Sequence, residues 1–529
     1  MNWFLIIVVA VVALLTIALS LYLLVIYQHP EDKNQAWFPK VVVVLGMSAA
    51  IYTVLMFPLD VANQQSCTLD IPLVDCTYTF PMDTLWEALY IANMILVFVL
   101  IPFSIFFYEA DSEWTGGKRW GSSLLWTLGV MVCAACVICI PYVFGGYAVY
   151  EIQSARSGIL PVLPYLANGT NGLNTCIGVF ASFTPGSSVP AVNSIPPLPL
   201  TGYYCDAGAS GGTETWKVRV SLITYAMAII ATIGWLLFLL FGSIGLVALP
   251  LDWIRGFITR PRSVISKAQY IERARDLARR AKDIKLVAEG LRREERTQGR
   301  SRKWRRNYNA LQTQVEILEE DQDQLETVFP QGEDPAYSWT VTVIMQWVKL
   351  MGGIIALGIS VAWCLQIILY ILIDPPVTPL LNDLFLAAND VFPLFGTFLF
   401  AVFVFYLQAA VIKGNFKFGL NLLIFRVHPV KQGATMMSSF LFNVALILLA
   451  STACIQFAAS AFALYANGTA ILNIYGNQLK SLEGLRYIYT KNIYVYAFMA
   501  LVVLTAAVLL IRGPDAWKKK KKMENYYSM

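Results

Sequence analysis

Charge is scarce in this sequence of 529 residues, because Asp, Glu, Lys and Arg together make up only 14% of it. Soluble globular proteins carry about 25% charged residues. Hydrophobic residues make up 57% of the chain, and its mean hydropathy is +0.59. These values exclude a soluble globular protein, and we expect a chain that crosses a membrane several times.

The motifs of several large enzyme classes are also missing. The sequence holds no Walker A loop, no Gly-rich dinucleotide loop and no His-Glu-x-x-His segment. Its two histidines, His29 and His428, lie far apart, which is too little material for a zinc site or a Ser-His-Asp site. We therefore expect no enzyme, no metal and no bound cofactor. Any active transport needs an ion gradient or a separate motor.

The basic residues do not indicate nucleic-acid binding. The net charge is +5, and the lysines and arginines cluster in loops beside apolar runs and in five consecutive lysines at 518–522. A basic run directly after a membrane span is typical of an anchor on anionic lipid. Cys133, Cys136 and Cys139 fall inside an apolar run without a nearby histidine. We interpret them as small residues for close helix packing and not as metal ligands.

Nine apolar runs reach the length of about 20 residues that a membrane-spanning helix needs. They predict an all-α fold, a polytopic membrane helical bundle of about nine transmembrane helices. The first run is too long for a cleaved signal peptide, so we expect a retained span with its N-terminus outside the cytosol. The runs are 3–27, 39–61, 84–108, 122–146, 219–249, 341–373, 389–412, 435–466 and 491–512.

One long polar segment, residues 255–334, interrupts these runs. It has 18 Lys and Arg between positions 255 and 306, and 8 acidic residues from 316 to 334. Apolar residues repeat at alternating spacings of 4 and 3 on both sides of Gly299. This heptad pattern predicts an antiparallel helical hairpin of the coiled-coil kind, with its acidic end near Arg273 and Arg275. The bases that directly follow the fifth run place the hairpin in the cytosol.

The alternation of spans then assigns the other loops. Loops 28–38, 109–121 and 413–434 share the cytosolic side with the hairpin. The outside loops hold Cys67, Cys76, Cys176 and Cys205, and the glycosylation sequons at Asn168 and Asn467. Disulfides and sequons are typical of an oxidising, glycosylating compartment, and 67–76 and 176–205 are the natural bridges. Those outside loops are 62–83, 147–218, 374–388 and 467–490.

Four domains follow from this organisation. Residues 1–250 form an N-terminal bundle of five spans, with the luminal loop 147–218 as either an irregular cap or a disordered linker. Residues 251–340 form the charged hairpin, and residues 341–512 form a C-terminal bundle of four spans. Residues 513–529 form a basic cytosolic tail.

Polar residues within the spans are candidates for function, because burying an ionisable group in a membrane is costly. Several lie close to span ends, so snorkelling to the interface is the alternative. Asp390 precedes a proline that can break the helix, as at the midplane sites of many transporters. We therefore favour Asp390 and Pro393 as the moving or binding element. The full candidate set is Asp60, Glu87, Asn93, Lys349, Asp390 and Pro393.

Four short stretches, taken in order, resemble the lipocalin-interacting membrane receptor (limb-region protein) family, closest to its lysosomal cobalamin transporter branch. They are Phe-Pro-Leu-Asp at 57–60, residues 101–109, residues 248–255, and Val-Phe-Pro-Leu at 391–394 followed by the basic loop 413–431. The number of spans, the outside N-terminus and the long helical loop also fit this family. Loop 147–218 is longer, and the tail more basic, than is usual for that branch.

This resemblance implies residence in lysosomes or other endomembranes, with the plasma membrane as the alternative location. It also implies a part in moving cobalamin (vitamin B12) from the lumen to the cytosol, as a transporter or as the escort of an ABC-type half-transporter. A different hypothesis is a receptor or signalling adaptor whose hairpin recruits cytosolic proteins. The lipid bilayer is the expected surrounding, and the sequence leaves self-association into a homo-oligomer open.

Overall fold

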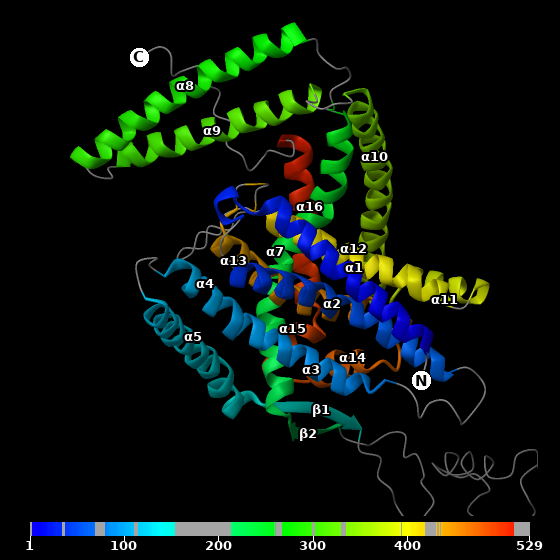
Figure 1. Cartoon of the computed structure of the whole chain (residues 1–529). Coiled ribbons are helices and arrows are strands. Elements are labelled where there is room, and N and C mark those ends of the chain that lie inside the picture. Colours follow the sequence, from blue (N-terminus) through cyan, green and yellow to red (C-terminus); the bar gives the residue numbers. More distant parts are fainter. Residues whose placement is uncertain are drawn as a thin grey trace, which may run out of the picture. The chain divides into compact units, whose positions relative to one another are not determined.

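The computed structural model describes nearly all of the predicted spans, and most of what it describes is helical (Figure 1). Within the described residues, nine helices are long and apolar enough to cross a membrane. The expected all-α polytopic bundle is thus confirmed. The structure describes residues 3–33, 37–68, 80–110, 115–153, 213–258, 260, 267–298, 302–329, 335–392, 394–417, 430, 433 and 435–512.

The chain forms two compact units. Unit 1 combines Met1–Phe241 with Gln366–Ala500, and unit 2 combines Gly242–Leu365 with Leu501–Met529. Unit 1 contains α1 (Trp3–Tyr27), η1 (Pro30–Asp32), α2 (Trp37–Thr68), α3 (Met82–Ile95), η3 (Leu96–Leu100), α4 (Ile101–Glu109), α5 (Gly116–Gly145), β1 (Tyr147–Gln153), β2 (Thr213–Arg219), most of α7 (Leu222–Ile258), η6 (Ile367–Leu372), α11 (Leu380–Val391), α12 (Phe395–Lys417), α13 (Met437–Ala461), α14 (Ala470–Leu472), η7 (Asn473–Leu479), α15 (Arg486–Thr490) and the start of α16 (Ile493–Arg512). Unit 2 contains the end of α7, α8 (Lys267–Gln298), α9 (Arg302–Val328), most of α10 (Pro335–Gln366) and the end of α16.

Helix α13 is the centre of unit 1. In the most apolar stretch of α13, 78% of the residues are buried, whereas in that of α1 only 11% are. Side chains of α13 such as Phe440 and Val444 pack with Val43 and Met47 of α2. Gly46 permits this contact, because a Cβ atom there would lie 2.6 Å from a methyl carbon of Val444. Small residues that let helices approach closely are a common basis of packing in membranes.

The third span changes its winding in the middle. Between α3 and α4 lies the π-helical segment η3, and the N–H of Ile101 bonds to the carbonyl of Leu96. Pro102 follows directly and lacks an N–H group, while its ring crowds the carbonyl four residues earlier. A wider π turn relieves that crowding, and such turns occur frequently at functional sites.

The loops of unit 1 gather into two groups. In the first group, residues 26–33 bond to residues 433–437, as in the N–H of His29 to Thr435 (3.0 Å), and Asp32 accepts from the hydroxyl of Tyr108 (2.9 Å). In the second group, the N–H of Glu483 donates to the carbonyl of Tyr147 (2.8 Å). These groups match the two sets of loops that the alternation of spans predicts. Which set faces the cytosol stays a prediction.

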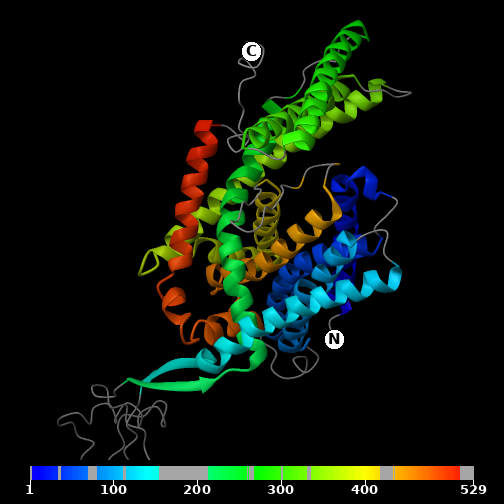
Figure 2. The ribbon, with the colours of Figure 1, turned by 90° about the vertical axis from the view of Figure 1, so that its left-hand side faces the viewer.

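A two-stranded antiparallel sheet lies at the two ends of loop 147–218, which is predicted to be luminal. Strands β1 and β2 pair from Tyr147 opposite Arg219 to Gln153 opposite Thr213 (Figure 2). Lys217 and Arg486 form ion pairs that tie the sheet to its surroundings, with Glu483 (2.8 Å) and Glu151 respectively. These strands were not predicted from the sequence, because two strands of seven residues give only a short alternating pattern. The interior of the loop lies outside the described residues.

In unit 2, α8 and α9 form the predicted antiparallel hairpin, and both views show the two helices side by side. Leu291, Trp304 and Leu311 form a buried cluster in its seam, and Leu325 is buried as well. The indole N–H of Trp304 donates to the carbonyl of Leu291 (2.9 Å), near the turn. At the opposite end the rings of Tyr270 and Phe329 stack with their centroids 4.5 Å apart. The cytosolic placement and the predicted domain boundaries stay predictions.

Candidate functional site

Asp60 is a buried carboxylate in the membrane-spanning part of unit 1. It lies on α2 and accepts hydrogen bonds from the indole N–H of Trp86 (2.9 Å) and from the backbone N–H groups of Ile471 (3.0 Å) and Ala470 (3.4 Å). The last two donors open the helical segment formed by α14 and η7, where the helix dipole favours a negative charge. Asp60 therefore joins α2, α3 and this segment. These three hydrogen bonds hold the Asp60 carboxylate in one position, so its role in the structure is to anchor these segments to one another.

A second pair of contacts lies beside Asp60. The rings of Trp86 and Tyr90 have centroids 6.1 Å apart, and the hydroxyl of Tyr90 is hydrogen-bonded to that of Tyr475 on η7. Burial, followed by the neighbouring Tyr90, raises the pKa of Tyr475 well above its ordinary value. Tyr475 thus stays a neutral phenol that can donate and accept. Together with Asp60, it holds η7 against α3.

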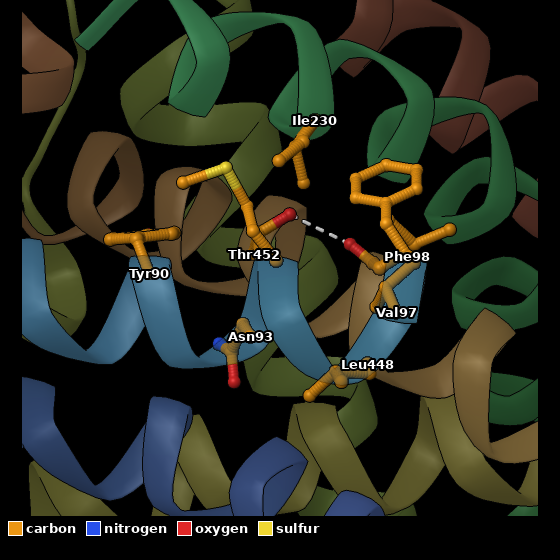
Figure 3. Close-up of a pocket in the computed structure, with 9 residues that line it drawn as sticks. Tyr90, Asn93, Val97, Phe98, Ile230, Leu448 and Thr452 are labelled. Carbon is orange, nitrogen blue, oxygen red and sulfur yellow. Dashed lines mark hydrogen bonds between the residues drawn. The ribbon is translucent and has the colours of Figure 1, made fainter. Parts of the chain in front are cut away.

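Asn93 lies beside a small cavity. Its amide nitrogen donates to the hydroxyl of Thr53 (2.8 Å), while its carbonyl oxygen Oδ1 is buried without a hydrogen-bond partner among the described residues. The cavity has a volume of about 10 Å³, close to what a single water molecule needs. Figure 3 shows it between the α3–η3 segment, α7 and α13. Its lining residues are Tyr90, Asn93, Met94, Val97, Phe98, Ile230, Leu448, Leu449 and Thr452.

The lining of this cavity is mostly apolar and closely packed. Its one polar side chain besides Tyr90 and Asn93 is Thr452, whose hydroxyl donates to the carbonyl of Leu449 in its own helix (2.7 Å; Figure 3). In this conformation the cavity accommodates a water molecule and no organic ligand. A ligand of the size of cobalamin cannot use it.

The break between α11 and α12 organises another polar cluster. Asn389 donates to the side-chain oxygen of Gln65 (3.2 Å) and to the hydroxyl of Tyr465 (3.1 Å), and it accepts from the N–H of Gly396 (2.9 Å). The hydroxyl of Thr397 completes the cluster through Gln65 (3.0 Å) and Tyr465 (3.1 Å). Asn389 therefore caps the start of α12 from the end of α11, in the manner of a helix N-cap.

The observed position of the helix break differs from the prediction. The seventh span begins at Phe395, and α11 is a separate helix before it, whereas hydropathy predicted one run from 389. Leu394 has φ = 73°, a left-handed conformation that costs a non-glycine residue about 1 kcal/mol or more. Asp390 itself is exposed, and Pro393 lies outside the described residues. The sequence pattern favoured the charge of Asp390, but its neutral neighbour Asn389 makes the contacts.

The other predicted charges are at the surface of their helices. Glu87 on α3 and Lys349 on α10 are both exposed. Near a span end, an exposed charge can extend to the interface. Of the six candidates, Asp60 and Asn93 are buried and lie in one region through α2 and α3. The functional role of all six stays a prediction.

The predicted modification sites are only partly described. Asn168, Cys76, Cys176, Cys205 and the side chain of Cys67 lie outside the described residues. Asn467 is exposed in the turn after α13, next to Gly468 with φ = 81°. Its glycosylation stays a prediction. The thiols at 133, 136 and 139 are free and exposed on α5, so they do not serve the close helix packing expected from the sequence.

Within the described residues, nine helices long and apolar enough to cross a membrane, with a charged helical hairpin between the fifth and sixth of them in the sequence, define a polytopic α-helical membrane protein. The chain belongs to the family described as LMBR1-like membrane protein, whose sequence profile matches residues 5–303 and 277–510. The resemblance to the limb-region protein family is thereby confirmed. None of the solved structures matches the chain significantly.

Full-length relatives support this assignment. A LIMR family protein of Oryza sativa subsp. japonica is 42% identical, with 98% of each chain covered. A LIMR family protein of Arabidopsis thaliana is 41% identical, covering 98% of this chain and 97% of the relative. A LIMR family protein of Dictyostelium discoideum is 35% identical, covering 97% of this chain and 98% of the relative.

Proposed function

We propose that the protein is an endomembrane escort for a partner transporter, in the cobalamin-export role that the resemblance implies, and that its hairpin docks the partner. The polar interior favours an escort over a pump. Asp60 and Asn389 bond to fixed neighbours on other helices, and the cavity beside Asn93 has room for one water molecule only. Each of these groups stabilises one arrangement of the bundle.

The observation that carries the proposal is the charge distribution along the hairpin. Around its turn, residues 292–306 contain eight Lys and Arg but only two Glu. Arg292, Arg296 and Arg306 are exposed there. Near the other end, residues 316–326 of α9 carry six acidic residues and no base. Along α8, about 40 Å separates the basic end at the turn from the first residue of the helix, Lys267, given the helical rise of 1.5 Å per residue.

This separation favours a protein partner with an acidic surface. Exposed charges contribute little to the stability of their own fold. Across an interface, however, complementary charges accelerate association and select partners. The partner implied by the resemblance is an ABC-type half-transporter. The alternative partner is a cytosolic signalling protein, in which case the chain is a receptor or adaptor.

Charge reversal at the basic turn tests the proposal. The variant carries Arg292→Glu, Arg296→Glu and Arg306→Glu. Its matched control carries Arg273→Glu, Arg275→Glu and Arg279→Glu, which change the same charge on exposed positions of α8 farther from the turn. Each protein is purified from native membranes with its partners, which are identified by mass spectrometry, and lysosomal cobalamin is measured in the same cells.

The escort function predicts that only the turn variant loses an ABC half-transporter and that cobalamin accumulates in lysosomes. Loss of cytosolic signalling proteins alone, with normal cobalamin distribution, would establish the adaptor instead. Equal partner loss in both variants would show that the basic turn is not the docking element.

A further inference from the structure

Arg260, just beyond the end of α7, lies on an aromatic platform in unit 2. Its guanidinium carbon is 3.4 Å from the ring centroid of Phe257 and 5.7 Å from that of Trp347 on α10. The two rings have their centroids 4.9 Å apart in an edge-on arrangement. One guanidinium nitrogen, Nη1, donates to the carbonyl of Phe257 (2.9 Å). The cation is therefore fixed in position before any ligand binds.

The helix packing beneath Arg260 holds this platform in place. Gly352 of α10 lies against the indole of Trp253, where a Cβ atom would come within 2.6 Å of the ring. Any larger residue at Gly352 would push α10 away from α7 and separate Trp347 from Phe257. Arg255 also binds within the unit, since it donates to the carbonyl of Leu509 at the end of α16 (3.2 Å).

Arg260 has donors left over. A guanidinium carries five N–H groups, and the one bond to Phe257 uses a single nitrogen. No acidic side chain in the described ranges forms an ion pair with Arg260. Trp253 and Trp347 are 41% and 52% exposed, at the end of the span in α7 and near the start of the span in α10. Tryptophan at that depth is typical of the membrane interface.

We propose that Arg260, with Trp347 and Phe257, binds the phosphate group of an anionic phospholipid. The planar guanidinium can donate two parallel hydrogen bonds to phosphate oxygens, which a lysine cannot do. The exposed indole faces offer apolar contact to the glycerol and upper acyl chain. Basic sites between helices at the cytosolic face of a membrane commonly hold anionic head groups. This site is independent of the proposed escort function, because it lies at the end of α7 and on α10 and not on the hairpin turn.

The test uses the full-length purified protein and native mass spectrometry. The probe is phosphatidylserine, compared with phosphatidylcholine and with inorganic phosphate. Arg260→Gln removes the cation, Arg260→Lys keeps the charge without the planar pair of donors, and Trp347→Ala removes part of the platform. The matched control is Arg279→Gln, which removes the same charge from an exposed position on α8.

We expect Arg260→Gln to weaken phosphatidylserine binding about fivefold, from roughly 1 kcal/mol for a basic residue at the surface. Trp347→Ala and Arg260→Lys should weaken it less, and Arg279→Gln should leave it unchanged. Equal weakening by Arg260→Gln and Arg279→Gln would overturn the site, because general charge attraction would then suffice. Inorganic phosphate binding as tightly as the lipid would overturn the assignment to a phospholipid. Circular dichroism checks that each variant keeps its helical content.

Discussion

The polar interior of unit 1 and the hairpin of unit 2 use polar side chains in opposite ways. In unit 1, the buried Asp60 and the partly buried Asn389 each make three hydrogen bonds to groups on other segments. On the hairpin, Arg280 pairs with Asp321 at 3.3 Å, and both side chains are more than a third exposed. Where water can replace a lost partner, a polar contact contributes little to stability. Interior contacts therefore preserve the fold, and hairpin charges are available for binding.

Substitution of Asp60 should show the largest effect. In Asp60→Ala the N–H groups of Trp86, Ile471 and Ala470 lose their acceptor in a buried site. We expect the free energy of unfolding to fall by about 4 kcal/mol, as when one partner of a buried charged contact is removed. Denaturant titration in detergent micelles, followed by circular dichroism, measures it. The control Glu87→Ala removes an exposed carboxylate and should change stability by less than about 0.5 kcal/mol. Similar losses in the two variants would contradict the anchoring role.

The neighbours Asn389 and Asp390 give a sharper version of the same comparison. Asn389→Leu removes the cap of α12 and the bonds to Gln65 and Tyr465, so we expect a loss of about 2 kcal/mol. Asp390→Asn changes an exposed group and should have little effect on stability. Hydrogen exchange at Gly396 should quicken in the first variant only. If Asp390→Asn were the more destabilising change, the assignment of Asn389 as the organising residue would be wrong.

The hairpin ion pair should show the smallest effect. Arg280→Gln is expected to cost about 0.5 kcal/mol at low salt and less at high salt, because the pair is exposed and screened. Asp321→Asn should cost no more than Arg280→Gln, because Arg280 also pairs with Asp276 (2.8 Å). Thermal unfolding at two salt concentrations measures both. If Arg280→Gln lowered the free energy of unfolding as much as Asp60→Ala, the proposed difference between interior and hairpin contacts would be wrong.

Much of this protein follows from local sequence. A run of about 20 apolar residues specifies a span without contacts to distant residues, because its length matches the hydrocarbon core of the membrane. The nine spans, the polar hairpin and the grouping of the loops therefore follow from hydropathy and charge alone. The heptad spacing likewise placed Leu291, Trp304 and Leu311 on one seam. Each of these features repeats over several turns, so an error at one residue does not change it.

Only the tertiary structure decided which polar residues meet. Asp60 contacts Ile471, which is 411 residues later, and Asn389 contacts Gln65, which is 324 residues earlier. Such contacts depend on the rotation and depth of each helix, and a difference of one residue turns a side chain by about 100°. For that reason the charge and the nearby proline singled out Asp390, whereas in the fold Asn389 makes the interior contacts. The average hydropathy and charge of whole segments predict the membrane topology. Which interior residues contact each other depends instead on how each side chain packs.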